Sequence, residues 1–269
     1  MRRRTIRVLV LLFVAPASAT CARAQENYEI QVYPGDTVDA KRTMVELHSN
    51  FTIDGRKTVS SDGELPTNHA FHETLEITHG WNSWFETGYY LFSSASVRDG
   101  WQFVGTHIRP RVRAPEKWRW PVGVSLSTEF GYVRPNFSAD TWTWELRPIV
   151  DKKAGKWYWA FNPTVEKSFR GPSQKLGWEF SPNAKVSYDV TRRIAFGLEY
   201  YGALGPIGNL DPLHEQEQQI VPTFDVDFGP NWEFNVGVGV GTTASTERLL
   251  VKTIVGYRFQ RFPFPRSKK

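Results

Sequence analysis

The chain has 269 residues, a formal net charge of +5 and a mean hydropathy of −0.43. It is long enough for one large barrel or two small domains, and after its first residues it has no apolar run near the roughly 18 to 20 residues of a membrane-spanning helix. The composition therefore excludes a helical membrane protein. It does not exclude a membrane-spanning β-barrel, in which only alternate residues need to be apolar.

Residues 1–24 have the three-part form of a cleavable secretory signal peptide. Four arginines within the first seven residues precede an apolar run from Val8 to Val14, and small residues lead to Ala24. This leader holds five of the 33 basic side chains and none of the 28 acidic ones, so cleavage near Ala24 leaves a nearly neutral chain. The basic excess is therefore no argument for a nucleic-acid partner.

The only cysteine, Cys21, also lies in the leader. After cleavage the mature chain has no disulfide, no thiol nucleophile and no cysteine metal ligand. We expect residues 25–42 to be a periplasmic N-terminal segment, residues 43–259 to be a barrel and residues 260–269 to be a C-terminal tail.

Apolar and polar residues alternate with period two in segment after segment, and hardly any segment has the period of an amphipathic helix. In chain order the predicted strands are Thr43 to Ile53, His69 to Thr78, Ser83 to Phe92, Trp101 to Arg113, Trp118 to Tyr132, Asp140 to Asp151, Lys156 to Phe169, Leu176 to Asp189, Arg193 to Ala203, Gln216 to Phe228, Asn231 to Gly241 and Glu247 to Phe259. Many of them have the length of about 10 residues that crosses a bilayer at a tilt. The pattern predicts an all-β fold, a transmembrane up-and-down antiparallel β-barrel of about 12 strands.

The connections between these strands alternate in length. Short ones such as Lys152 to Gly155 and Val190 to Arg192 alternate with longer ones, above all Asp54 to Asn68 and Leu204 to Glu215. With an even number of strands both termini lie at one end, so the short turns face the periplasm and the long loops face outward. This asymmetry is typical of outer-membrane barrels.

Alternation alone fits a soluble barrel with an apolar core as well as a membrane barrel with an apolar outer face. The signal peptide, the loop lengths and the Trp and Tyr residues at strand ends favour lipid. In the strand from Lys156 to Phe169, Trp159 and Phe161 then face lipid, whereas Asn162 and Thr164 face the lumen.

Prolines inside predicted strands favour the soluble alternative, because a closed barrel has no free edge where a missing N–H is harmless. We expect bulges or lost ladder bonds at six of them: Pro110, Pro121, Pro148, Pro163, Pro182 and Pro222.

The polar face is rich in charge. Its lumen-lining candidates are Glu46, His48, Glu76, Glu86, Arg109, Arg111, Glu129, Glu145, Arg147, Glu166 and Glu179. These side chains could line a channel and orient a solute, or they could form an ion-pair network that plugs a narrow barrel, since unpaired charges in a confined lumen are costly. Both arrangements can coexist in one barrel.

We expect no catalytic residue, no metal site and no cofactor. A hydrolase dyad on the lipid side needs its His and Ser on one face, but His48 and Ser49 in "ELHSN" are adjacent and point opposite ways. His69, His72 and His79 lie near strand ends without a ligand spacing typical of metal sites.

Four segments together resemble a family of bacterial outer-membrane barrels labelled for the "MetA-pathway of phenol degradation". They are "FHETLEITHGWNSWFETGYYLF", "WELRPIVDKKAGKWYWAFNPTVEKSF", "GLEYYGALG" and "LLVKTIVGYRF", in this order between about His69 and Phe259. The resemblance implies a transmembrane barrel for uptake of aromatic compounds, and no residue roles carry over. The last segment is similar to the aromatic-ended strand that the barrel assembly machinery reads, although ten residues follow Phe259.

The leading functional hypothesis is a porin-like passive channel of the bacterial outer membrane for small, possibly aromatic solutes. The alternative is a structural or interaction barrel with a sealed, charged lumen, and a membrane-face lipid hydrolase is the third hypothesis. The expected partners are outer-membrane lipids, a small-molecule solute and, during biogenesis, the barrel assembly machinery.

Overall fold

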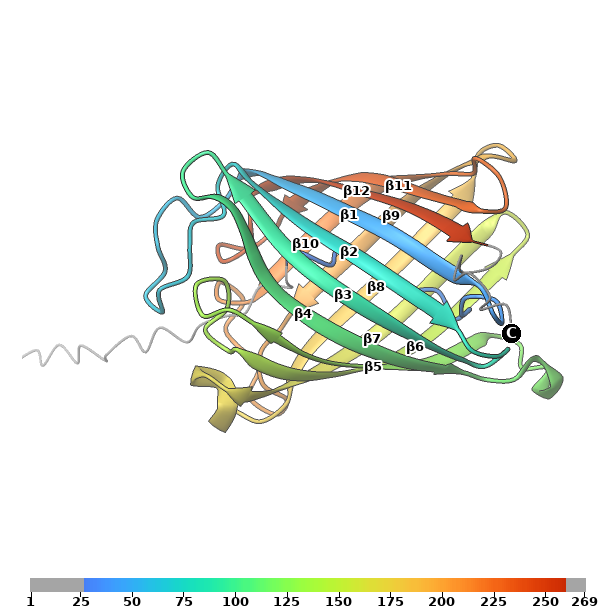
Figure 1. Ribbon diagram of the computed structural model, residues 1–269, viewed down its shortest axis with the longest axis horizontal. Helices are drawn as coiled ribbons and strands as arrows, with labels where there is room; N and C mark the ends of the chain where they lie inside the picture. Colours follow the sequence, from blue (N-terminus) through green and yellow to red (C-terminus); the bar gives the residue numbers. More distant parts are fainter. Residues whose placement is uncertain (1–26, 260–269) are drawn as a thin grey trace, which may run out of the picture.

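The computed structural model describes residues 27–259, which form one closed antiparallel β-barrel (Figure 1). Each strand pairs with its neighbours in chain order, and the last strand closes the barrel against the first. The strands are β1 (Thr43–Asp54), β2 (Ala70–Gly80), β3 (Phe85–Ser96), β4 (Gly100–Arg113), β5 (Gly123–Val133), β6 (Trp142–Ala154), β7 (Trp157–Arg170), β8 (Glu179–Asp189), β9 (Ile194–Ala203), β10 (Glu217–Val226), β11 (Trp232–Gly241) and β12 (Leu249–Phe259). The predicted up-and-down barrel of 12 strands is confirmed.

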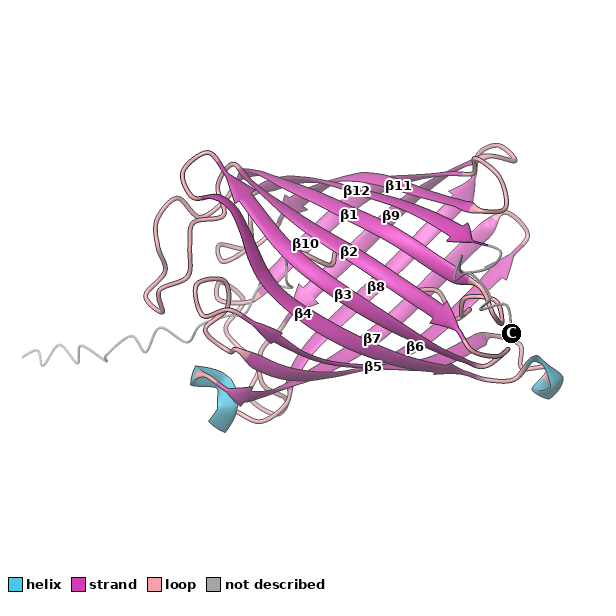
Figure 2. Cartoon of the chain, viewed as in Figure 1, coloured by secondary structure: helices cyan, strands magenta, loops and turns pink. Residues whose placement is uncertain are grey.

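Helical structure within residues 27–259 is confined to two short 3-10 helices, η1 (Glu116–Trp118) and η2 (Pro172–Lys175) (Figure 2). Over the same residues, no helix has the length and apolar character needed to cross a membrane. The η1 helix corrects the predicted strand from Trp118, because β5 begins at Gly123 instead. Arg119 has a left-handed φ of 52°, and Pro121 lacks a ladder donor, so neither residue suits a strand.

The two ends of the barrel differ as the loop lengths predict. β1 starts and β12 finishes at the same end, where the turns over residues 155–156 and 190–193 are short. At the opposite end the loops over residues 55–69 and 204–216 are long (Figure 1). If the short turns face the periplasm, the long loops surround an outward-facing mouth.

The apolar face of the barrel points outward. Trp159 and Phe161 are exposed on β7, whereas Asn162 and Thr164 are buried. Apolar side chains are exposed in the same way along the other strands, so the outside of the barrel is an apolar surface and the inside is polar. A soluble barrel with an apolar core has the reverse arrangement and is excluded.

Four of the six prolines lie at gaps in a ladder whose register continues unchanged, whereas Pro121 lies outside β5 and Pro182 is paired with Pro163 in a continuous β7–β8 ladder. Between β4 and β5 the pairing skips from Ile108 to Arg111 around Pro110, and the register is unchanged beyond the gap. The β6–β7 ladder has a similar gap around Pro148 and Pro163, and the β10–β11 ladder has one beside Pro222. Register shifts occur elsewhere, between Phe92 and Ser93, between Trp142 and Thr143, and between Thr52 and Asp54. Lost ladder bonds are thus found at these prolines, whereas the expected bulges are not.

The barrel is filled by its own N-terminal chain. The sequence pattern predicts a periplasmic segment over residues 25–42, but the structure places residues 27–38, here called the lumen segment, inside the barrel. Asn50 Nδ2 donates a hydrogen bond to Asn27 O near the end of the barrel that carries the long loops. Val38 N donates one to the carboxylate of Glu86 near the opposite end. The lumen segment therefore runs the length of the interior before β1 begins.

Apolar residues of the lumen segment explain this position. Ile30 and Val32 pack in a buried cluster with Leu250 and Tyr201, and Tyr28 packs in a second cluster with Phe92. These partners are apolar residues that the strands turn into the lumen. Burial of such side chains on both partners favours the inside over water.

Glu73 departs from the apolar outer face. On β2 it lies between the exposed residues Phe71 and Leu75, and its carboxylate accepts a hydrogen bond of 2.6 Å from Ser49 Oγ. A carboxylate turned to lipid is costly, and one hydrogen bond offsets only part of the lost hydration. We therefore expect Glu73 to lower the stability of the barrel.

Two substitutions on this face of β2 should act in opposite directions. Leu75→Arg should lower the free energy of unfolding by about 2–4 kcal/mol, because it places a cation in the apolar band. Glu73→Leu should raise it by less than about 2 kcal/mol, because it removes a charge from lipid. Urea unfolding in lipid vesicles measures both, and equal tolerance of the two changes would contradict the face assignment.

Candidate functional site

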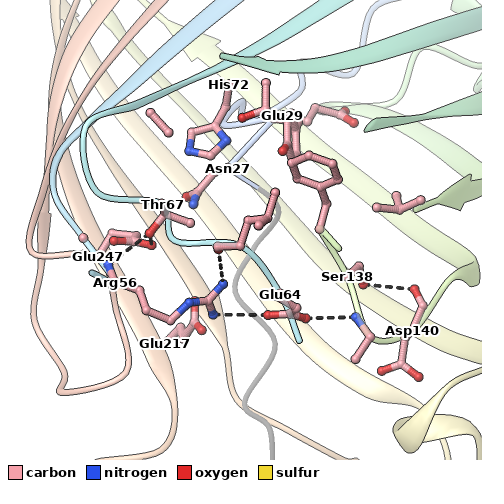
Figure 3. Close-up of a pocket in the computed structure, with 18 of the residues that line it drawn as sticks. Asn27, Glu29, Arg56, Glu64, Thr67, His72, Ser138, Asp140, Glu217 and Glu247 are labelled. Carbon is pink, nitrogen blue, oxygen red and sulfur yellow. Dashed lines mark hydrogen bonds and ion pairs between the residues drawn. The ribbon is translucent and has the colours of Figure 1, made fainter. Parts of the chain in front are cut away.

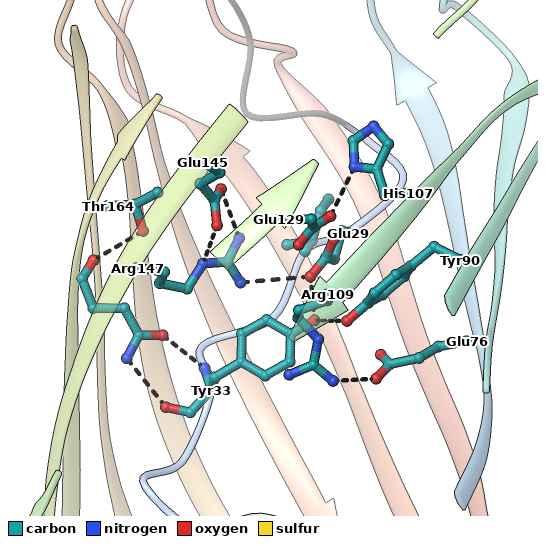
Figure 4. Close-up of polar contacts among 12 residues, drawn as sticks. Glu29, Tyr33, Glu76, Tyr90, His107, Arg109, Glu129, Glu145, Arg147 and Thr164 are labelled. Atoms are coloured by element: carbon teal, nitrogen blue, oxygen red, sulfur yellow. Dashed lines mark hydrogen bonds and ion pairs between the residues drawn. The ribbon is translucent and has the colours of Figure 1, made fainter. Parts of the chain in front are cut away.

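Side chains of the barrel hold the backbone of the lumen segment. Asn162 on β7 accepts a hydrogen bond from Tyr33 N (2.7 Å) and donates one to Tyr33 O (3.1 Å) (Figure 4). Lys252 on β12 donates to Ile30 O at 2.9 Å. The segment has no strand ladder of its own, so these contacts satisfy backbone groups that would otherwise be buried without a partner.

Tyr33 lies among three arginines. The guanidinium carbons of Arg109 and Arg147 are 4.9 and 4.7 Å from the centre of its ring, within the range of a cation–π contact. Arg109 also donates to Glu76 at 2.6 Å and to Glu86 at 3.2 Å. These buried guanidinium groups are paired with carboxylates, which offsets the loss of hydration on burial.

The same network ties the wall to the lumen segment. Arg111 Nε lies 2.7 Å from Glu86, and its Nη1 donates to Pro34 O at 3.2 Å. Arg147 lies 2.8 Å from Glu145 and 3.4 Å from Glu29 of the segment. Arginines on β4 and β6 therefore bind wall carboxylates and the lumen segment at once.

Four glutamates form a row across β5, β6, β7 and β8. Glu129 is paired with Glu145, Glu145 with Glu166, and Glu166 with Glu179 in the strand register. We call them the glutamate row. Like charges directly opposite each other destabilise a sheet, and rings of carboxylates favour cations in channels. Arg147 offsets Glu145, and His107 Nδ1 lies 2.7 Å from Glu129.

A cavity of about 580 Å³, here called the vestibule, lies at the end of the barrel that carries the long loops (Figure 3). The loop over residues 55–69 crosses it, because Arg56 pairs with Glu64 at 3.1 Å and Glu64 accepts a hydrogen bond from Ala139 N at 2.9 Å. Ten carboxylates and three arginines are among its described lining residues, and the glutamate row belongs to them. The vestibule is therefore strongly acidic.

At the rim of the vestibule the carboxyl of Glu247, in the loop between β11 and β12, is largely buried. Burial raises the pKa of Glu247, and the hydrogen bond from Thr67 Oγ1 acts in the opposite direction. This contact joins the β11–β12 loop to the loop over residues 55–69, which steadies the mouth.

All eleven lumen-lining candidates lie on the inner side of the barrel, in three groups. The arginine network contains Glu76, Glu86, Arg109, Arg111, Glu145 and Arg147. The glutamate row contains Glu129, Glu145, Glu166 and Glu179. Glu46 and His48 on β1 lie beside Glu76 on β2. As the alternation predicts, His48 is buried in the lumen whereas Ser49 is on the outer face with Glu73.

The sequence interpretation missed the partners that come from the lumen segment, Glu29 and Tyr33, and the buried lysine Lys252. Apolar residues at lumen-facing positions were the available signal. Phe92 and Leu250 occupy such positions, although large apolar side chains are not expected to line a water-filled channel.

No protein-family model and no curated protein matches the sequence. The fold is similar to solved outer-membrane barrels. They include the COG4313 outer membrane channel from Pseudomonas putida F1 (TM-score 0.55, 12% identity, 86% of this chain and 100% of that chain), the KdgM porin (0.51, 10%, 81% and 99%) and the NanC porin (0.50, 9%, 80% and 99%). At these identities the likeness shows the fold, which is that of an outer-membrane β-barrel.

The glutamate row should make the pore prefer cations. Replacing Glu166 and Glu179 together by Gln should lower the permeability ratio of K⁺ to Cl⁻, because two charges leave the wall of the vestibule. Reversal potentials in a KCl gradient measure this ratio. Glu116→Gln is the matched control, since Glu116 is exposed in a turn at the other end of the barrel. An unchanged ratio in the double variant would rule out this role.

Asn162 should hold the lumen segment in place. Asn162→Leu keeps the side-chain size but removes both hydrogen bonds to Tyr33, so amide exchange of residues 27–38 should become about tenfold faster. Hydrogen-exchange mass spectrometry measures this rate. Asn183→Leu is the control, because Asn183 is buried opposite Asn162 without a bond to the segment. Equal acceleration by both variants would show general loosening instead.

Proposed function

We propose that this protein is a passive outer-membrane channel for small solutes. The observation that carries the proposal is the vestibule of about 580 Å³, which lies at one end of a closed barrel and is lined largely by polar side chains. Its volume lies within the range of about 300–1,000 Å³ of small-molecule sites. The structural likeness to the COG4313 channel and to two porins supports the same function.

Location in the outer membrane belongs to this proposal. The apolar outer face, the signal-like residues 1–24 and the aromatic end of β12 at Tyr257 and Phe259 support it. The last strand would then be read by the barrel assembly machinery, and outer-membrane lipids would contact the exposed apolar side chains.

Two independent features support a proposal for the solute class. The resemblance to the phenol-degradation barrels favours aromatic compounds, and the acidic vestibule favours neutral or cationic solutes over anions. We therefore propose neutral or cationic aromatic molecules as the solutes. In liposome swelling, benzylammonium should enter faster than benzoate.

A sealed barrel is the second candidate function, and the lumen segment is the observation that favours it. Residues 27–38 and the arginine network occupy the interior between the vestibule and the opposite end. A lipid hydrolase has less support, because Ser49 and His48 lie on opposite sides of the β1 strand.

Conductance in planar bilayers separates the first two candidates. We expect the mature chain to conduct weakly and a variant without residues 27–38 to conduct several times more, because the deletion empties the lumen. Heat-modifiability on a gel confirms that the variant is folded. A full-length protein that passes neither ions nor small solutes, although its deletion variant conducts, would favour the sealed barrel.

A further inference from the structure

Glu46, His48 and Glu76 form a compact cluster on the lumen side of β1 and β2, away from the vestibule. Glu46 and His48 are two residues apart on β1, so their side chains point to the same side, and Glu46 is directly opposite Glu76 in the register. All three side chains are buried, with relative exposures of 6%, 0% and 1%.

Each member of the cluster has at least one polar atom without a hydrogen bond to any described residue. These atoms are Glu46 Oε1, both ring nitrogens of His48, and Glu76 Oε2. His48 Nε2 and Glu76 Oε2 are 3.5 Å apart, and one ligand atom from each of the three residues lies within 4.8 Å of the others. Buried polar groups in native proteins nearly always have partners, so this convergence calls for one.

The nearby cations do not supply that partner. Arg109 binds the other oxygen of Glu76, Oε1, at 2.6 Å. Arg258 binds Glu233 at 2.6 Å, and no ion pair joins Glu46 to a basic side chain among the described residues. Two carboxylates are thus close together while one of them has no paired charge, an arrangement that a bound cation would relieve.

The barrel leaves room for this arrangement. Gly256 on β12 lies opposite Glu46, and a Cβ atom at that position would approach Glu46 Cγ to 2.9 Å and Met44 Cε to 2.7 Å. A larger residue at position 256 would therefore require the side chains of Met44 and Glu46 to shift.

We propose that Glu46, His48 and Glu76 bind one divalent transition-metal ion of the Zn²⁺ class. One imidazole nitrogen and two carboxylate oxygens are a ligand set that suits Zn²⁺, whereas Mg²⁺ and Ca²⁺ prefer oxygen ligands alone. Three protein ligands leave a further position for water. The ion would join β1 to β2 beside the β1–β12 seam that closes the barrel.

Titration of the folded, untagged and chelator-treated protein tests this site. Co²⁺ serves as the spectroscopic probe and Zn²⁺ as its competitor. We expect one equivalent of Co²⁺ to give visible d–d bands that Zn²⁺ abolishes, and Zn²⁺ to raise the temperature of the heat-modification transition. A folded protein that shows neither change would overturn the proposal.

Variants locate the ion. Glu46→Gln and His48→Asn should each weaken Zn²⁺ binding by more than about tenfold. His72→Asn is the matched control. Like His48, His72 on β2 is buried with both ring nitrogens unpartnered, but it lies outside the cluster and packs against the Tyr28 ring. Undiminished binding in folded Glu46→Gln, or loss of binding in His72→Asn, would contradict the assignment.

X-ray absorption of the wild-type protein with Zn²⁺ keeps the test decisive if both ligand variants fail to fold. We expect one imidazole and oxygen ligands around the ion. A spectrum without imidazole would overturn the site. The proposal is independent of channel function, because every measurement reads metal binding instead of transport.

Discussion

Pairing of buried charge is the constraint that shapes the interior of this barrel. The strands turn their apolar face outward, so their charged face is enclosed, where an unpaired charge is costly. Arg109 lies between Glu76 and Glu86, and Lys252 binds Glu199 at 2.5 Å. Ion pairs between wall side chains do not provide a partner for every buried donor. Three donors, Arg111, Asn162 and Lys252, bind the backbone of the lumen segment.

This constraint divides the interior into two regions. Around Tyr33, positive and negative groups alternate and the lumen segment is held from several strands. Toward the mouth acidic groups exceed basic ones, because the glutamate row places carboxylates side by side and carboxylates outnumber arginines. A chain selected only for stability would avoid this excess, so we associate the second region with solute selection and the first with control of passage.

The alternation of apolar and polar residues predicted the barrel, the strand number and the direction of each face. A strand with one apolar and one polar side shows a clear period of two residues in its sequence. The alternation also predicted Glu166, Arg109 and the other candidates for the lumen side. It could not predict the path of residues 27–38, since a short segment of mixed polar and apolar residues has the same pattern in the periplasm as in a lumen. The inward-facing Phe92 and Leu250 carried that information, yet only the closed barrel shows what they contact.

Site-directed cross-linking tests most directly whether the lumen segment lies inside the barrel. The mature chain is expected to have no cysteine, because Cys21 lies in the leader. Cysteines at Ile30 and Leu250, which share one buried cluster, should be joined by a short bifunctional thiol reagent in intact outer membranes. A cysteine at Ile30 paired with one at the exposed residue Val97 should not be joined. Efficient linkage of the second pair without the first would contradict a filled lumen.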